Sequence, residues 1–212
     1  AGATVCTVCS SGYFSAQGAS TCTQVQAGEF AANDLSEGVN SAASQAVDCP
    51  AGSISTSAGA TSCTLCASGT YQSSAGQISC ATVSAGSFAS ITDVATASGA
   101  TGTTVCAMGY SSDSGATACT PCASGYYQDS TGQASCNGVS AGYYASDSSS
   151  ASVSSAAITE IACAAGYYSE YASSICTQVT AGYLATDGAG AGVNTAASAQ
   201  EACGSGYYSS SP

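Results

Sequence analysis

Cysteine is the residue type in this chain with the clearest chemical potential, and its spacing is regular. Fourteen cysteines occur in 212 residues. From Cys9 to Cys203, the gaps between successive cysteines are 13, 27, 14, 3, 14, 26, 13, 3, 14, 27, 13 and 27 residues. The even count and the recurring gaps predict a disulfide framework. A disulfide framework implies an oxidising compartment, so we expect an extracellular or cell-surface location.

Two pairing schemes fit these gaps. The first joins cysteines 13 or 14 residues apart: Cys9–Cys22, Cys49–Cys63, Cys66–Cys80, Cys106–Cys119, Cys122–Cys136 and Cys163–Cys176. The second closes each Cys-x2-Cys pair on itself and bridges the long gaps: Cys22–Cys49, Cys80–Cys106, Cys136–Cys163 and Cys176–Cys203. We favour the short loops, because a Cys-x2-Cys disulfide is typical of redox sites with a thioredoxin-like context, which this sequence lacks.

The short-loop scheme leaves Cys6 and Cys203 without partners inside the chain. Cys203 opens a loop that the chain does not close, and Cys6 closes a loop that the chain does not open. Joined tail to head, the two ends form one more loop of nearly the right length. We therefore expect Cys203 to pair with Cys6 of the next copy, so that the predicted partners are identical copies arranged end to end in a filament.

Other site chemistry is not predicted. The chain carries twelve acidic residues and no Lys, Arg or His, which gives a formal net charge of −12. Without cations it cannot neutralise nucleic-acid phosphates or bind anionic membranes by charge. The acidic residues are scattered, and the Cys-x2-Cys pairs lie too far apart for a zinc site. We expect no catalytic residue, no cofactor, no metal and no membrane span, since no apolar run approaches the length of a transmembrane helix.

The residues between the cysteines form a repeated sequence unit, which sets the positions of the cysteines. The basic unit is Cys-x2-Gly-aromatic-x8–9-Cys, with a second glycine before the closing cysteine, as at Gly12 and Gly18 in the first copy. Glycine at both places predicts two turns with positive φ. We expect one continuous array over 1–212, with units at about 9–48, 49–105, 106–162 and 163–202. In this scheme residues 203–212 continue into a next copy of residues 1–6.

The long cysteine gaps contain a degenerate copy of the same unit. Valine stands where its first cysteine would be, at Val25, Val83, Val139 and Val179. The place of the second cysteine is taken by Val39, Val153 and Val193, and by Thr96 in the remaining copy. Each long gap is therefore interpreted as an ancestral unit in which an apolar pair has replaced the disulfide. Losing both cysteines together avoids a reactive thiol.

Composition and turn residues predict the fold class. Large aliphatic residues are scarce among the Gly, Ser and Ala, so a single large core is not expected. We predict a small disulfide-rich repeat protein, an extended rod of stacked disulfide-closed loops with short β-hairpins and little helix. The best local helix candidates are residues 38–47 and 192–201, each long enough for one or two turns.

The motif Cys-x2-Cys-x-x-Gly-x-Tyr, followed by small residues and a further cysteine, resembles the ephrin-receptor-like cysteine-rich repeat. The clearest copies run from Cys63 to Cys80 and from Cys119 to Cys136. The pattern is also similar to modules of the TNF-receptor type. The resemblance implies an end-to-end array, as in extracellular proteins of protists and algae that include mastigoneme filaments. The valine copies depart from the family pattern, so the inherited pairing does not extend to them.

The leading functional hypothesis is a structural protein, a repeating segment of an extracellular filament or appendage. The alternative is the rod-like ectodomain of a surface receptor, adhesin or surface antigen. An enzyme is not expected. Serine-rich filler makes O-linked glycosylation plausible. The candidate acceptors are Ser148, Ser149, Ser150, Ser154 and Ser155.

Overall fold

The computed structural model describes residues 5–92, 94–147, 149 and 151–210. The chain forms two compact bodies that interleave in sequence. The N-terminal body contains Ala1–Ser84, Phe88–Thr104 and Ser114–Ala118, and the C-terminal body contains Ala85–Ser87, Val105–Asp113 and Cys119–Pro212. We use the term module for each repeat copy and number the modules by their opening residues. These are Cys9, Val25, Cys49, Cys66, Val83, Cys106, Cys122, Val139, Cys163, Val179 and Cys203.

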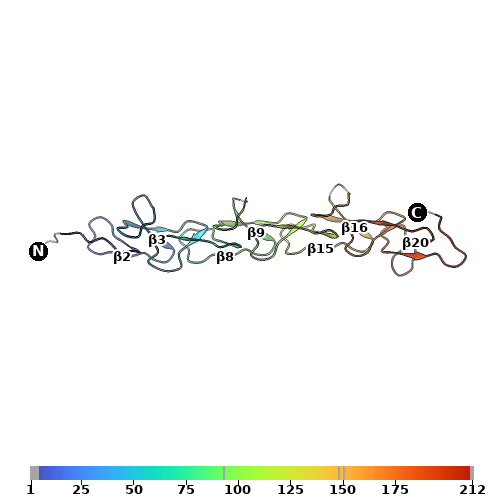
Figure 1. Ribbon diagram of the computed structural model, residues 1–212, viewed down its shortest axis with the longest axis horizontal. Coiled ribbons are helices and arrows are strands. Elements are labelled where there is room, and N and C mark those ends of the chain that lie inside the picture. Colours follow the sequence, from blue (N-terminus) through green and yellow to red (C-terminus); the bar gives the residue numbers. More distant parts are fainter. Residues whose placement is uncertain (1–4, 93, 148, 150, 211–212) are drawn as a thin grey trace. The chain divides into compact units, whose positions relative to one another are not determined.

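Each module opened by a cysteine, except the Cys203 module, forms a hairpin (Figure 1). Each strand of these hairpins has two residues. The strands are antiparallel and enclose the turn that carries the second glycine. The pairs are β1 (Tyr13–Phe14) with β2 (Thr23–Gln24), β5 (Ser53–Ile54) with β6 (Thr64–Leu65), β7 (Thr70–Tyr71) with β8 (Ala81–Thr82), β12 (Tyr110–Ser111) with β13 (Thr120–Pro121), β14 (Tyr126–Tyr127) with β15 (Asn137–Gly138), and β18 (Tyr167–Tyr168) with β19 (Thr177–Gln178).

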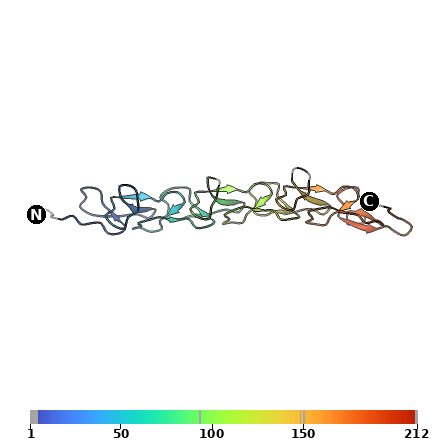
Figure 2. The ribbon, with the colours of Figure 1, turned by 45° about the horizontal axis from the view of Figure 1, so that its top comes forward.

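Each module opened by a valine forms a longer hairpin with a longer loop. Figure 2 shows the loop that follows β3, in dark blue, projecting beyond its hairpin. The pairs are β3 (Glu29–Ala32) with β4 (Gln45–Asp48), β16 (Tyr143–Ser146) with β17 (Thr159–Ala162), and β20 (Tyr183–Thr186) with β21 (Ala199–Ala202). The Val83 module has three strands in the order β10 (Val94–Ala95), β9 (Ser87–Ile91) and β11 (Gly102–Val105).

Six disulfides close the short hairpins. They are Cys9–Cys22, Cys49–Cys63, Cys66–Cys80, Cys106–Cys119, Cys122–Cys136 and Cys163–Cys176. Each joins residues 13 or 14 apart, and their Cα atoms lie 5.6–5.8 Å apart. The predicted class, a small disulfide-rich repeat protein with short hairpins and little helix, is confirmed.

The two helix candidates are wrong. Residues 38–47 and 192–201 run into strands β4 and β21. Within these segments Ala42 and Ala196 have φ values of 57° and 56°. A residue in this left-handed region interrupts a right-handed helix, and here it places the chain in the second turn of the module. The alanine-rich composition that favoured helix is therefore overridden by the repeat geometry.

The valine modules are held by small apolar clusters in place of a disulfide. In the N-terminal body, Val25 packs with buried Ala31 and Ala43, and with Phe14 and Val39 at the edge. The C-terminal body has the same arrangement around Val139, with Val153 and Tyr127 at the edge. Two of the valine pairs, Val25 with Val39 and Val139 with Val153, therefore share a cluster. The aromatic ring comes from the preceding module, so each cluster also joins two modules.

Truncating Val25 is expected to destabilise the N-terminal body. Val25 is completely buried, and Val25→Ala removes two methyl groups and leaves a cavity. We expect the free energy of unfolding to fall by about 2 kcal/mol, measured by urea denaturation. The matched control is Val8→Ala, because Val8 is 67% exposed. If both variants lost the same free energy of unfolding, the result would contradict the conclusion that the Val25 cluster stabilises this body.

Candidate functional site

The search for a site begins with metal ligands and titratable groups among the described residues. No group of three or more Cys, Asp or Glu among them could hold a metal ion. Burial raises the pKa of Tyr127, and the nearby Glu160 and Asp129 raise it further. This shift moves Tyr127 away from the pH range in which it could act as a base. What recurs in the structure is a set of backbone contacts between modules, and these docking surfaces form the candidate site.

The first recurring contact joins each opening residue to the first glycine of the module before it. The backbone N–H of the opening residue donates to the glycine carbonyl at 2.8–3.0 Å. In the N-terminal body the pairs are Val25 to Gly12, Cys49 to Gly28, Cys66 to Gly52 and Val83 to Gly69. In the C-terminal body they are Cys106 to Gly86, Cys122 to Gly109, Val139 to Gly125, Cys163 to Gly142, Val179 to Gly166 and Cys203 to Gly182. Valine and cysteine are equivalent here because only the backbone takes part.

The second recurring contact runs from the second turn of one module to the opening residue of the module before it. The N–H of the positive-φ residue in that turn donates to the opening residue's carbonyl at 2.8–3.2 Å. In the N-terminal body the pairs are Ala42 to Cys9, Gly59 to Val25, Gly76 to Cys49, Gly99 to Cys66 and Gly115 to Val83. In the C-terminal body they are Gly132 to Cys106, Ala156 to Cys122, Ala172 to Val139 and Ala196 to Cys163.

The third contact links each module to the second module after it. The first glycine of a module lies against the backbone of the second-turn residue two modules on, so closely that a methyl group on the glycine would collide with its carbonyl oxygen. In the N-terminal body the pairs are Gly12 with Gly59, Gly28 with Gly76, Gly52 with Gly99 and Gly69 with Gly115. In the C-terminal body they are Gly86 with Gly132, Gly109 with Ala156, Gly125 with Ala172 and Gly142 with Ala196. Glycine is therefore required both for its positive φ and for its missing side chain.

A serine clamp strengthens docking after each valine module. The hydroxyl of Ser55 donates to the Glu29 carbonyl at 2.9 Å, while the Gly28 N–H donates to the carbonyl of Ser55. Ser112, Ser169 and Ser209 hold the same positions and donate to the carbonyls of Ser87, Tyr143 and Tyr183. Ser112 and Ser169 are buried, so loss of these hydroxyls would leave partly buried carbonyls with one fewer donor.

The second turn is less well optimised than the first. In the Val25, Val139, Cys163 and Val179 modules an alanine, and not a glycine, adopts positive φ. We expect Ala42→Gly to raise the free energy of unfolding by about 0.5–1 kcal/mol, because relief of left-handed strain exceeds the extra flexibility of the unfolded chain. Urea denaturation would measure the gain. Ala75→Gly, at an exposed position without positive φ, should be neutral or destabilising; a gain there of similar size would contradict this explanation.

The candidate glycosylation residues lie in the sequence between β16 and β17. Ser149, Ser154 and Ser155 are exposed, whereas Ser148 and Ser150 lie outside the described residues. Ser149 donates through both its N–H and its hydroxyl to the Asp147 carboxylate, and these bonds hold the pKa of Asp147 below its usual value. An exposed hydroxyl is accessible to a modifying enzyme, so these three positions stay available as acceptors.

The two cysteines at the ends of the series remain free thiols. Cys6 is exposed and Cys203 is half-buried. Cys203 already makes the backbone bond that its counterparts Cys49, Cys106 and Cys163 make. It therefore occupies the position of a disulfide-forming cysteine.

Sequence reasoning found the turns and the loops but missed the contact between every second module. The signal was present, because a glycine three residues after each opening residue is invariant within this chain, even where the aromatic residue is replaced. A turn with positive φ does not by itself require glycine, since Asn and Asp also tolerate this conformation. Strict glycine at one offset indicates close approach of another backbone.

Comparison with known proteins supports the repeat assignment. A family model described as tyrosine-protein kinase ephrin type A/B receptor-like matches residues 52–106 and 109–156. No curated protein matches the chain. The described residues contain no helix long and apolar enough to cross a membrane.

Proposed function

We propose, on the premise that residues 52–106 and 109–156 are tandem ephrin-receptor-like cysteine-rich repeats, that this chain is a structural segment of an extracellular filament. Such repeats and six disulfides indicate a secreted or surface location. The observation that carries the proposal is the recurrence of one docking scheme within both bodies. In both bodies, the first-turn glycines and second-turn residues with positive φ form backbone hydrogen bonds or close contacts with other modules.

Mechanism in such a protein is mechanical. Each hydrophobic cluster contains only a few side chains, so the modules depend on covalent loops and on backbone bonds to their neighbours. A disulfide in a loop of this length contributes about 3 kcal/mol in the chain-entropy model. A repeat array of this kind gains stability from its interfaces as modules are added. A protein whose stability increases as similar modules are added suits an extracellular polymer that must withstand mechanical force.

The surface chemistry fits the same role. The chain has no Lys or Arg, so trypsin-like proteases find no cleavage site in it. We propose that Ser149, Ser154 and Ser155, together with Ser148 and Ser150, carry O-linked glycans that hydrate the filament. Mass spectrometry of the peptide spanning residues 146–158 before and after β-elimination would test this. An unmodified peptide from native material would contradict it.

A second candidate function is the ectodomain of a surface receptor or adhesin. The description of the matching family as receptor-like favours it. In that case the modules would hold a ligand-binding domain away from the cell surface. Such repeats are typically non-enzymatic, so both candidates treat the array as a scaffold and differ in what it carries.

Electron microscopy of native extracellular material distinguishes the two candidates. An antibody raised against the purified chain should label filaments at regular intervals along their length. Label confined to the cell membrane, with unlabelled filaments, would overturn the filament proposal and favour the ectodomain. The control is antibody preabsorbed with the purified chain.

A further inference from the structure

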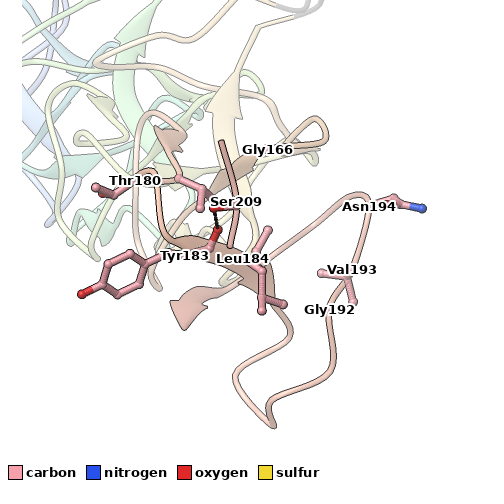
Figure 3. A pocket seen from close by; sticks show the side chains of 10 residues that line it. Gly166, Thr180, Tyr183, Leu184, Gly192, Val193, Asn194 and Ser209 are labelled. Carbon is pink, nitrogen blue, oxygen red and sulfur yellow. Dashed lines mark hydrogen bonds between the residues drawn. The ribbon is translucent and has the colours of Figure 1, made fainter. Parts of the chain in front are cut away.

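The C-terminal body has an open groove beside the Val179 module. The groove has a volume of about 280 Å³ and is lined by Gly166, Val179, Leu184, Ala185, Gly192 and Ser209, among others. Figure 3 shows the Leu184 and Val193 side chains at this groove, together with the hydrogen bond from Ser209 to Tyr183. Its lining is apolar or uncharged, so it suits a segment of small residues that brings its own backbone donors and acceptors.

The corresponding groove in the N-terminal body is filled. Residues 58–62 lie there, along the surface formed by the Cys9 and Val25 modules. Gly59 donates its N–H to the Val25 carbonyl at 2.8 Å, and Ala31 donates its N–H to the Ala60 carbonyl at 2.8 Å. Gly12 lies against Gly59, and Gly38 lies against the Thr61 carbonyl. The residues that line the open groove are the repeat counterparts of these, with Gly166 for Gly12, Val179 for Val25, Ala185 for Ala31 and Gly192 for Gly38.

The same filling occurs at the other valine modules. At Val83, Gly115 donates to the Val83 carbonyl at 2.8 Å and Ala89 donates to the Ala116 carbonyl at 2.9 Å. At Val139, Ala172 donates to the Val139 carbonyl at 2.8 Å. The Val179 groove thus has the same hydrogen-bond acceptor, the carbonyl of the opening valine, as the three grooves that a second turn occupies. Like them, it is lined by small residues.

The first half of the occupying module is already in place at Val179. Cys203 donates its N–H to the Gly182 carbonyl at 2.9 Å, as Cys49 does to Gly28. Ser209 forms the serine clamp with Tyr183 and Gly182. In the filled groove, the occupying element is a second turn followed four residues later by a cysteine, because Gly59 precedes Cys63 by four residues and Cys63 pairs with Cys49.

Residues 1–6 of the chain match that element in sequence. Residues 1–4 read Ala-Gly-Ala-Thr, identical to residues 58–61, and Cys6 follows Gly2 by four residues. Cys6 is an exposed free thiol. We propose that the groove at Val179 binds residues 1–6 of a second copy of this chain, with Gly2 of that copy in the place of Gly59. This inference rests on the proposed filament function and names the site at which one copy joins the next.

Docking would bring the second copy's Cys6 to Cys203 and allow a covalent link. In thiol–disulfide exchange, the Cys203 thiolate attacks a low-molecular-weight disulfide and releases one thiol. The Cys6 thiolate then attacks the Cys203 sulfur of the mixed disulfide and releases the second thiol. One disulfide of the small molecule is thereby reduced to two thiols, and one Cys6–Cys203 disulfide is formed.

Analytical ultracentrifugation of the purified 212-residue chain tests the proposal. With dithiothreitol absent and oxidised glutathione added, we expect a ladder of oligomers, and peptide mapping should identify Cys6 joined to Cys203. Gly2→Pro removes the N–H that would donate to the Val179 carbonyl, and should weaken the non-covalent association of a Cys6→Ser background at least tenfold. The matched control is Ala1→Pro in the same background, which alters the same segment but keeps that donor and should associate like the parent.

Hydrogen exchange supplies a second readout. The amide of Ala185 is the counterpart of Ala31 and should gain protection when the Cys6→Ser chain associates. A chain that stays monomeric at all concentrations, a ladder joined through Cys6–Cys6 or Cys203–Cys203, or equal association of the two proline variants would each overturn the proposed joint. These outcomes concern only the joint. The filament function fails separately, if native filaments are not labelled by the antibody.

Discussion

Replacing Gly12 by alanine is expected to lower the free energy of unfolding of the N-terminal body by about 2–5 kcal/mol. Gly12 has a φ of 78°, and an alanine there pays about 1–2 kcal/mol for the left-handed conformation. The added methyl group would also collide with the Gly59 backbone, which cannot move without losing its bond to Val25. Urea denaturation gives the total loss. Hydrogen exchange at the Gly59 amide shows whether the damage lies at the docking surface.

Gly18→Ala is the matched control for this experiment. Gly18 lies in the same disulfide loop and has nearly the same φ, 81°. Among the described residues other than its two chain neighbours, none has an atom within 4 Å of the Cβ position at Gly18. The Gly18→Ala variant should lose only about 1–2 kcal/mol of unfolding free energy, the cost of an alanine in the left-handed conformation. Hydrogen exchange at the Gly59 amide should not change. If both variants lost the same free energy of unfolding, the close contact between Gly12 and Gly59 would not contribute to stability.

Removing one disulfide is the second change with a large expected effect. The double variant Cys66→Ala with Cys80→Ala opens a loop of 14 residues and should cost about 3 kcal/mol in loop-closure entropy. Cys66 is almost completely buried, so a cavity adds to this loss. We expect the amides of β7 and β8 to exchange faster, because the hairpin that the bond closes has only two residues in each strand.

A variant of a free cysteine distinguishes the loss of a disulfide from the mere replacement of a cysteine side chain. Cys6→Ser changes a cysteine that forms no disulfide within the chain and should alter the free energy of unfolding by less than about 0.5 kcal/mol. A loss in Cys6→Ser as large as that in the double variant would contradict the assignment of the effect to the Cys66–Cys80 bond. The comparison is made without reductant, since reductant would open all six bonds.

Much of the local structure follows from residue spacing. Two glycines at fixed offsets predict two positive-φ turns, and Gly12 and Gly18 both adopt them. Val25 and Val39 were expected to replace a cysteine pair, and they lie in one cluster. These predictions depend on short-range geometry, in which the residue type and its offset carry the information.

What the sequence did not reveal depends on relations between modules. Residues 38–47 contain alanines that favour helix, but the docking of the second turn fixes Ala42 in the left-handed region. Phe14 packs against the valine cluster of the following module, a partner that its own module does not indicate. The contact of Gly12 with Gly59 joins backbone atoms only, so no side-chain pattern marks its partner.

The docking scheme has a consequence for biosynthesis. The three recurring backbone contacts join modules that are one or two apart along the chain, as between Gly12 and Gly59. In each of the six disulfides the second cysteine is the next one in sequence after the first. During vectorial entry into an oxidising compartment, each module could therefore close and dock before the next one emerges. Correct pairing would then follow from the order of translation, with little need for disulfide reshuffling.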